Sequence, residues 1–210
     1  IPEWEHFRFL PQRNVLHRHT VDRHMLETAV EAAKLTRTVR RPDLLLFASL
    51  FHDIGKGFPN KDHSEFGAEL MVKLATRIGF SQPEVEILEF LVREHLTLST
   101  AATRRDLDDP LTISDVVAKV KNHENLNLLH ALSIADGKAT GKTAWSDWKA
   151  NLIADLVGRC SAAMSGEEPV APPDLFLPEG FNKQISVTVS QKESNYELEI
   201  IVKDQVGLLS

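Results

Sequence analysis

Cysteine is almost absent from the sequence, since Cys160 is the single one among 210 residues. One thiol excludes an internal disulfide, and such scarcity is typical of proteins in a reducing compartment. The sequence also lacks any apolar run of the roughly 18–20 residues that a membrane-spanning helix needs. We therefore expect a cytoplasmic protein without a membrane partner.

Positive charge is not in excess either, because the formal net charge is −6 at pH 7. This argues against nucleic-acid binding as the main function, since an extended nucleic-acid surface carries excess lysine and arginine. A hydrophobic share of 42% and a charged share of 26% are those of an ordinary globular protein. The chain starts at Ile1 and stops at "DQVGLLS", where a helix should begin, so we expect a piece of a longer protein.

The first 164 residues predict an all-helical domain after a loop-like opening that extends to Val15. Apolar residues recur at helical spacing, and capping residues mark where several helices start. The clearest are Thr20 as an N-cap, Pro42 as a first helical residue and Ser81 as an N-cap. The first helix is expected to start at Thr20, and the second to cover 42–57 and end at its glycines. A polar turn is expected at 99–110, followed by a short helix from Thr112 or Ser114. The remaining helices are expected over 62–79, 81–98, 122–140 and 144–164.

The composition changes near residue 165, where four prolines fall within residues 169–178. Such a stretch without apolar periodicity predicts a linker, which we place at 165–183. Beyond it, "QISVTVS" and "YELEIIV" predict two strands joined by a turn. Two strands alone are marginal in water, so this part is expected to need further chain or a partner surface.

Five of the nine histidines are interpreted as solvated or packing residues, three in the opening segment and two on the 122–140 helix. They are His6, His17, His19, His123 and His130. The other four lie in or beside different predicted helices, together with two aspartates: His24, His52, His63, His95, Asp53 and Asp136. Imidazole and carboxylate suit divalent cations, and helices of a bundle can bring such residues together. Spacing alone does not prove that they converge.

The order His24, His52-Asp53, Asp136 resembles the HD superfamily of metal-dependent phosphohydrolases, whose pattern is a His, a His-Asp pair and a later Asp. "HDIGKG" follows an apolar helix, as in that superfamily, and the likeness covers roughly residues 14–160. His63 and His95 are similar to the two further histidines of members that hold two metal ions and cleave phosphodiesters.

Longer blocks narrow the resemblance, among them "HRHTVDRHMLETAVEAA", "AATRRDLDDP" and "ALSIADGKATGKTAWSDWKANLI". They are similar to the bifunctional uridylyltransferase/uridylyl-removing enzymes that modify the PII nitrogen-signalling protein, a family with an adenylyl variant. In that family a transferase domain precedes the HD domain, and two glutamine-sensing ACT domains follow it. "YELEIIVKDQVGLLS" resembles the start of an ACT domain, with Val206 in place of the usual proline. The resemblance implies an HD domain at 1–164 and a truncated ACT domain at 184–210, with no transferase activity in this piece.

The implied reaction is metal-dependent removal of UMP or AMP from a tyrosine of PII. The primary ion would be bound by His24, His52, Asp53 and Asp136, while His63 and His95 would bind a second ion or steady the phosphate. Mg or Mn is favoured, and Fe or Zn is compatible with these ligands. Asp53 could bridge two ions. Lys56 is either a phosphate contact or a solvated lysine at a helix end.

Several alternatives stay open. Arg104 and Arg105 either contact phosphate or PII, or form salt bridges to Asp106, Asp108 or Asp109, and we favour the salt bridges. Trp145 and Trp148 are interpreted as packing residues rather than a base-stacking pair. The domain as a whole could instead hydrolyse free nucleotides or a guanosine alarmone. It could also be a non-catalytic module that binds metal and glutamine, or a helical scaffold.

Overall fold

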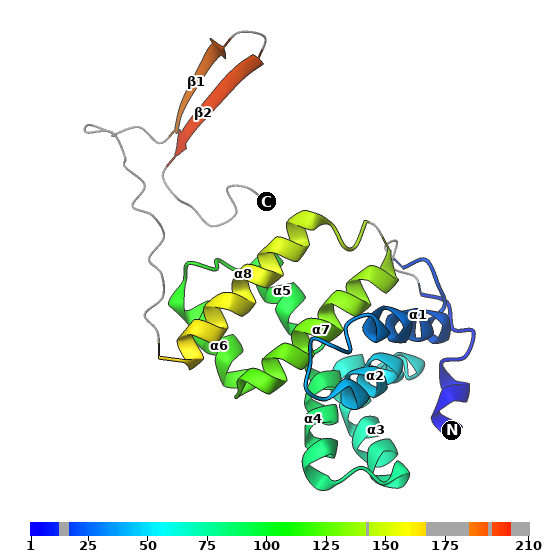
Figure 1. Cartoon of the computed structure of the whole chain (residues 1–210). Helices are drawn as coiled ribbons and strands as arrows, with labels where there is room; N and C mark the ends of the chain where they lie inside the picture. The colour runs from blue at the N-terminus through cyan, green and yellow to red at the C-terminus, as the bar shows by residue number, and fades with distance from the viewer. Residues whose placement is uncertain (13–16, 142, 167–184, 193–194, 203–210) are drawn as a thin grey trace. The chain divides into compact units, whose positions relative to one another are not determined.

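The computed structural model describes residues 1–12, 17–141, 143–166, 185–192 and 195–202. The chain divides into two compact units, one helical and one a β-hairpin, and each is described by itself (Figure 1). No described helix combines the length and the apolar character that crossing a bilayer requires. The prediction of a mostly helical protein is confirmed.

The described part of the helical unit contains eight α-helices and two short 3-10 helices (Figure 1). In chain order they are η1 (Pro2–His6), α1 (Val21–Ala33), α2 (Pro42–Phe51), η2 (Ile54–Gly57), α3 (His63–Ile78), α4 (Gln82–Arg93), α5 (Thr97–Arg104), α6 (Pro110–Val120), α7 (His123–Thr140) and α8 (Asp147–Met164). The opening segment, which we expected to be loop, thus contains η1.

Capping residues start three of these helices where the sequence places them. Thr20 has extended backbone angles and is the N-cap of α1. The Asp62 carboxylate accepts hydrogen bonds from two backbone amides at the start of α3. Ser81 forms a capping box with Glu84 at the start of α4. The Asp62 and Ser81 contacts satisfy amides that have no partner within their own helix. Gly79 ends α3 in the left-handed conformation with φ of 103°, which favours glycine.

The predicted turn at 99–110 is wrong over its first half, because α5 extends to Arg104. Leu98, Ala101 and Ala102 are buried at helical spacing, so packing against the core outweighs the weak helix propensity of the neighbouring serine and threonines. The start of the next helix is also misplaced. Asp109 caps α6 through its carboxylate, and Pro110 occupies the first helical position.

The end of α2 differs from the expectation that Gly55 and Gly57 would terminate it. The helix ends at Phe51, and Asp53 has φ of −101° and ψ of 15°, outside helical geometry. Gly55 has a different role, since a Cβ there would lie 2.0 Å from the carbonyl oxygen of His63. The missing side chain lets η2 pack directly against the start of α3.

Helix α7 lies at the centre of the helical unit and packs against α1 and α2 on one flank and α8 on another (Figure 1). It also contacts α4, α5 and α6, so residues from distant parts of the sequence meet along it. Leu128, Leu129 and Leu132 are fully buried there. Burial of such side chains is the main stabilising contribution to a fold of this type.

The second unit is an antiparallel hairpin of β1 (Ile185–Lys192) and β2 (Asn195–Val202). Its register pairs Val187 with Ile200 and Val189 with Leu198. The two predicted strands are therefore present. The predicted linker at 165–183 lies almost wholly outside the described residues, as does the ACT-like "DQVGLLS" segment with Val206.

Candidate metal centre

Three predicted ligands from three helical segments meet in a buried group, which we call the first triad: His24, His52 and Asp136. The Nε2 atoms of His24 and His52 lie 3.3 Å apart. The Asp136 Oδ1 is 3.0 Å from His24 Nε2 and 3.5 Å from His52 Nε2. Ligand atoms about 2.1 Å from one ion lie roughly 3.0–3.4 Å from each other in octahedral or tetrahedral geometry. The triad has about these separations.

The helices explain how the first triad forms. His24 lies on the buried face of α1, one turn before Thr28. His52 follows the last residue of α2, and Asp136 comes from the central helix α7. Both α1 and α2 pack against α7, so the contacts that build the core also bring the three side chains together.

Backbone carbonyls set the orientation of two ring systems. The Nδ1–H of His52 donates to the Ser49 carbonyl at 3.0 Å, and the Nδ1–H of His95 donates to the Val92 carbonyl at 2.7 Å. In a neutral imidazole this leaves the Nε2 lone pair free toward the centre, as in protein metal sites where a partner fixes the tautomer.

A second group, the second triad, consists of Asp53, His63 and His95. The Asp53 Oδ1 lies 3.6 Å from His95 Nε2 and 3.9 Å from His63 Nε2. His95 is buried beyond the end of α4, whereas His63, the first residue of α3, is partly exposed. The second triad is therefore wider and closer to solvent than the first.

Asp53 faces both triads with different oxygens. Its Oδ2 lies 3.5 Å from His52 Nε2 and 3.7 Å from His24 Nε2, while Oδ1 faces the second triad. The side chain is buried, and Oδ1 has no hydrogen-bond partner among the described residues. A buried carboxylate oxygen without a partner is costly unless a cation compensates it. These residues therefore fit a divalent metal ion, and the position of Asp53 suits a carboxylate shared by two.

Charge inside the centre follows the same arrangement. Burial would raise the pKa of Asp53, but His52, Lys56 and His95 outweigh it and hold the pKa below its ordinary value. Burial likewise opposes ionisation of Asp136, yet hydrogen bonds from His24 and His52 hold its pKa well below the ordinary value. Both carboxylates are thus ionised near neutral pH, as metal ligands must be.

Two of the buried histidines, His52 and His95, differ in pKa. Burial lowers the pKa of His95 to about 4, so its ring is neutral. Burial also acts to lower the pKa of His52, but Asp53 and Asp136 outweigh it and raise the pKa. His52 therefore holds a proton more readily than His95 when no metal competes for it.

Lys56 lies within the centre rather than in solvent. Its Nζ is 2.6 Å from Asp53 Oδ2 and donates to Gln12 Oε1 at 2.7 Å. Of the two interpretations made from the sequence, a solvated lysine at a helix end does not describe this position. The ammonium group stands where it can meet an anionic ligand of the metal centre.

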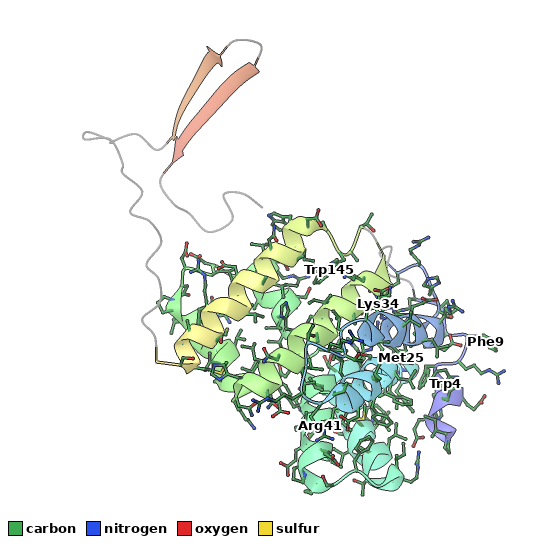
Figure 2. All side chains as sticks on the ribbon, in the orientation of Figure 1. Trp4, Phe9, Met25, Lys34, Arg41 and Trp145 are labelled. Carbon is green, nitrogen blue, oxygen red and sulfur yellow. The ribbon has the colours of Figure 1, made fainter. Side chains whose placement is uncertain are left out.

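A cleft of about 580 Å³ opens over the second triad and Asp136. Helix α5 lines one side with Ser99, Thr100 and Thr103. Gly137 of α7 and Trp145, which lies in the connection between α7 and α8 (Figure 2), line another. A volume of this size is in the range of small-molecule sites.

The two arginines of "TRRD" have different surroundings. Arg105 forms a salt bridge to Asp115 at 2.9 Å, which is none of the three aspartates that we expected, so the predicted pairing is wrong in its partner. Arg104 lines the cleft, and the structure gives it no ion pair within the described residues. Asp108, one of the expected partners, pairs with Arg159 instead.

The two tryptophans also have different surroundings. Trp145 is partly buried against the core, as predicted, but it also lines the cleft. The prediction that Trp148 is a packing residue is wrong, because 65% of it is exposed.

Sequence reasoning missed one residue beside the centre. His17 lines the cleft with its ring against that of His24, with ring centroids 5.3 Å apart. Burial lowers the pKa of His17 to about 4. Its closeness to the start of α1, only four residues before Val21, was the available signal, because it holds the imidazole beside the first turn.

Fold and site together define a class of protein: a helical domain in which histidines and aspartates from separate helices surround a divalent-metal centre. Residues 21–140 match the HD domain family, and the chain belongs to that family. The match covers all three residues of the first triad and all three of the second.

More particular relatives carry the name bifunctional uridylyltransferase/uridylyl-removing enzyme. The protein of that name from Mycobacterium tuberculosis is 49% identical over 100% of this chain and 26% of its own length. The one from Streptomyces coelicolor is 54% identical over 80% of this chain and 20% of its own length. The one from Aliivibrio fischeri is 33% identical over 95% of this chain and 24% of its own length. The chain thus spans about a quarter of the curated relatives that it matches.

Proposed function

We propose that this chain hydrolyses the phosphodiester between a nucleotidyl group and a protein tyrosine, as the uridylyl-removing part of a larger bifunctional enzyme. The group removed is UMP, and the substrate is uridylylated PII. The observation that carries the proposal is the pair of triads that share Asp53 at the floor of a cleft. The names of the relatives favour uridylyl over adenylyl as the group removed.

The reaction cleaves the bond between phosphorus and the tyrosine oxygen. The oxygen of one water forms the new bond to phosphorus, and its proton goes to the tyrosine oxygen, which leaves as the phenol. The products are UMP and unmodified tyrosine. A divalent ion in such a centre lowers the pKa of bound water and neutralises charge on the phosphoryl oxygens.

The residues of the chain divide the work. His24, His52 and Asp136 are proposed to hold one ion, His63 and His95 a second, and Asp53 both. Lys56 and Arg104 offer positive charge at the cleft, where a phosphodiester would need it. Lys56 would exchange its Asp53 contact for a phosphoryl oxygen as the substrate enters. Mg or Mn is the proposed metal, since carboxylate-containing sites suit these ions.

The remaining part of the chain is proposed to be regulatory. We assign residues 1–164 to the HD domain, 165–183 to a linker and 184–210 to the start of an ACT domain. The antiparallel hairpin of β1 and β2 is compatible with that assignment. Glutamine would be the effector of the complete ACT domains.

The test is release of UMP from uridylylated PII by this chain, with and without Mn²⁺. We expect Mn²⁺-dependent release that a His52→Ala, Asp53→Ala double variant loses. His123→Ala is the matched control, because this exposed histidine at the start of α7 lies outside both triads. If the folded, metal-loaded protein released no UMP, that result would contradict the proposal for this chain.

The same assay separates the alternatives. Hydrolysis of free nucleotides or of a guanosine alarmone without release from PII would identify a different phosphohydrolase. Metal binding without hydrolysis of any of them would identify a non-catalytic module. The six predicted ligands are the residues that make up the two triads, and this closeness counts against an inert module.

A further inference from the structure

Trp145 is the one large aromatic side chain that the described residues place on the wall of the metal cleft. It lies against Gly137, the residue directly after Asp136 of the first triad. We propose that the Trp145 indole is the platform on which the nucleobase of the nucleotidyl group stacks. The inference rests on the proposed function, because it assigns a base subsite to that substrate.

The packing between Trp145 and α7 is close. A Cβ on Gly137 would lie 2.2 Å from Cε3 of the Trp145 ring and 2.9 Å from Cζ3. Glycine at this position therefore lets the indole ring lie directly on the helix backbone. The backbone amide of Trp145 also donates to the Gly141 carbonyl at 3.1 Å. The ring is thus held in place before any ligand arrives, which reduces the ordering cost of binding.

The distance along the chain suits a nucleotide. Asp136 belongs to the first triad, and the next residue, Gly137, packs against the Trp145 indole, so phosphate at the metal centre leaves the attached nucleoside near Trp145. The hydroxyl-bearing residues Ser99, Thr100 and Thr103 of α5 line the same cleft. Hydroxyl groups donate or accept, so they can meet the polar edge of a base whose face is stacked.

Trp148 provides a contrast within the same segment. It is 65% exposed and does not line the cleft, whereas Trp145 is partly buried and does. The two residues share their chemistry and lie three positions apart. Comparison of their variants therefore separates stacking in the cleft from a general effect of removing an indole.

The first experiment measures binding of UMP and of ribose 5-phosphate, which lacks the base, to the Mn²⁺-loaded chain. We expect Trp145→Ala to weaken UMP binding roughly 5- to 150-fold, the range for loss of one base–aromatic stack. Ribose 5-phosphate should change far less, Trp145→Phe should retain part of the UMP affinity, and Trp148→Ala should match the unaltered chain. A thermal melt of each variant establishes that it is folded.

The second experiment measures hydrolysis of the p-nitrophenyl ester of UMP and of methyl p-nitrophenyl phosphate. Trp145→Ala should raise KM for the nucleotide ester by a similar factor, with a much smaller effect on the base-free ester. Equal losses for both substrates, or for both ligands, would show that Trp145 only supports the fold and would overturn the proposal. Failure of UMP to bind more tightly than ribose 5-phosphate would overturn it as well.

The two experiments keep the base subsite and the proposed function apart. Tryptophan-dependent binding of UMP without release of UMP from PII would uphold the subsite and contradict the function. Release of UMP that is indifferent to Trp145→Ala would do the reverse. Indole fluorescence gives an independent signal, since stacking should quench emission in a Trp148→Phe chain and not in a Trp145→Phe chain.

Discussion

The two triads use the same residue types but differ in depth and closeness. The atoms of the first triad lie 3.0–3.5 Å apart, and its two histidines are buried. In the second, Asp53 Oδ1 lies 3.6 Å and 3.9 Å from the histidine nitrogens, and His63 is partly exposed. A site with preset ligands loses less entropy when it binds an ion. We infer that the first triad binds its ion tightly, while the ion of the second exchanges more readily.

The largest expected effect comes from the first triad. Loss of a residue that merely supports a ligand costs about 10–100-fold in metal affinity or activity, so loss of a ligand should cost more. We expect His24→Ala to reduce hydrolysis by more than about 100-fold, without rescue by millimolar Mn²⁺. Steady-state kinetics at increasing Mn²⁺ measure this. Rescue at high Mn²⁺ would contradict the assignment of His24 to the tighter triad.

Replacement in the second triad should have a smaller and reversible effect. We expect His63→Ala to reduce hydrolysis about 10–100-fold at low Mn²⁺ and to recover part of it as Mn²⁺ rises. The control is His6→Ala, another exposed histidine outside both triads. A loss as complete as that of His24→Ala would mean that the triads act as one inseparable site.

Gly55→Ala tests how the second triad is positioned. The new Cβ would lie 2.0 Å from the His63 carbonyl oxygen and 2.9 Å from the Gly67 amide nitrogen, so η2 and α3 must move apart. We expect a loss of about 1–3 kcal/mol in the free energy of unfolding, as for overpacked cores, and weaker binding of the second ion only. Denaturant unfolding and metal titration measure the two effects.

Gly158→Ala is the matched control for that variant. No atom lies within 4 Å of a Cβ at Gly158, which is exposed in the interior of α8. Alanine there should be neutral or should stabilise the helix by about 0.5–1 kcal/mol. If Gly55→Ala behaves like Gly158→Ala, close packing of η2 on α3 does not position His63.

The smallest expected effect concerns protons. The pKa of His52 is raised, so in the metal-free chain its ring holds a proton at pH 6.5, whereas His95, with a pKa of about 4, does not. A metal ion needs the neutral ring, so binding at the first triad should release a proton and weaken as pH falls. Binding of a metal ion to His95 should not release one above about pH 5, because that ring is already neutral there.

Calorimetric titration in two buffers with different ionisation enthalpies measures this release. Proton release that is the same with and without His52 would remove the difference that we infer between His52 and His95. A His52→Ala chain serves as the reference, since only the second event should remain in it.

Helices whose starts carry capping residues could be predicted from the sequence, whereas a helix that forms only through burial could not. N-cap residues such as Thr20 and Ser81 favour the backbone conformation in which a helix begins, so the starts of α1 and α4 could be predicted from the sequence. Helix α5 could not, because its small and hydroxyl-bearing residues have weak propensity and form a helix only through burial of Leu98, Ala101 and Ala102.

Residue spacing alone could not predict that the site residues converge, so the prediction of the site depended on the resemblance to the HD superfamily. The order of His24, His52, Asp53 and Asp136 indicated a metal-binding pattern, but only the packing of α1 and α2 on α7 brings the atoms together. That Asp53 faces both triads, and that Trp145 and Trp148 differ, depends on side-chain directions near helix ends. Such directions are set by tertiary contacts rather than by periodicity.

The position of Asp53 between the triads is the central claim, and titration of Mn²⁺ into the metal-free chain tests it most directly. The account predicts two ions per chain, a tighter one and a weaker one, and a weakening of both in Asp53→Asn. Asp155→Asn, which alters an exposed aspartate paired with Arg159, should leave both unchanged. Binding of a single ion, or an Asp53→Asn chain that loses only one of two, would contradict a carboxylate shared by the two triads.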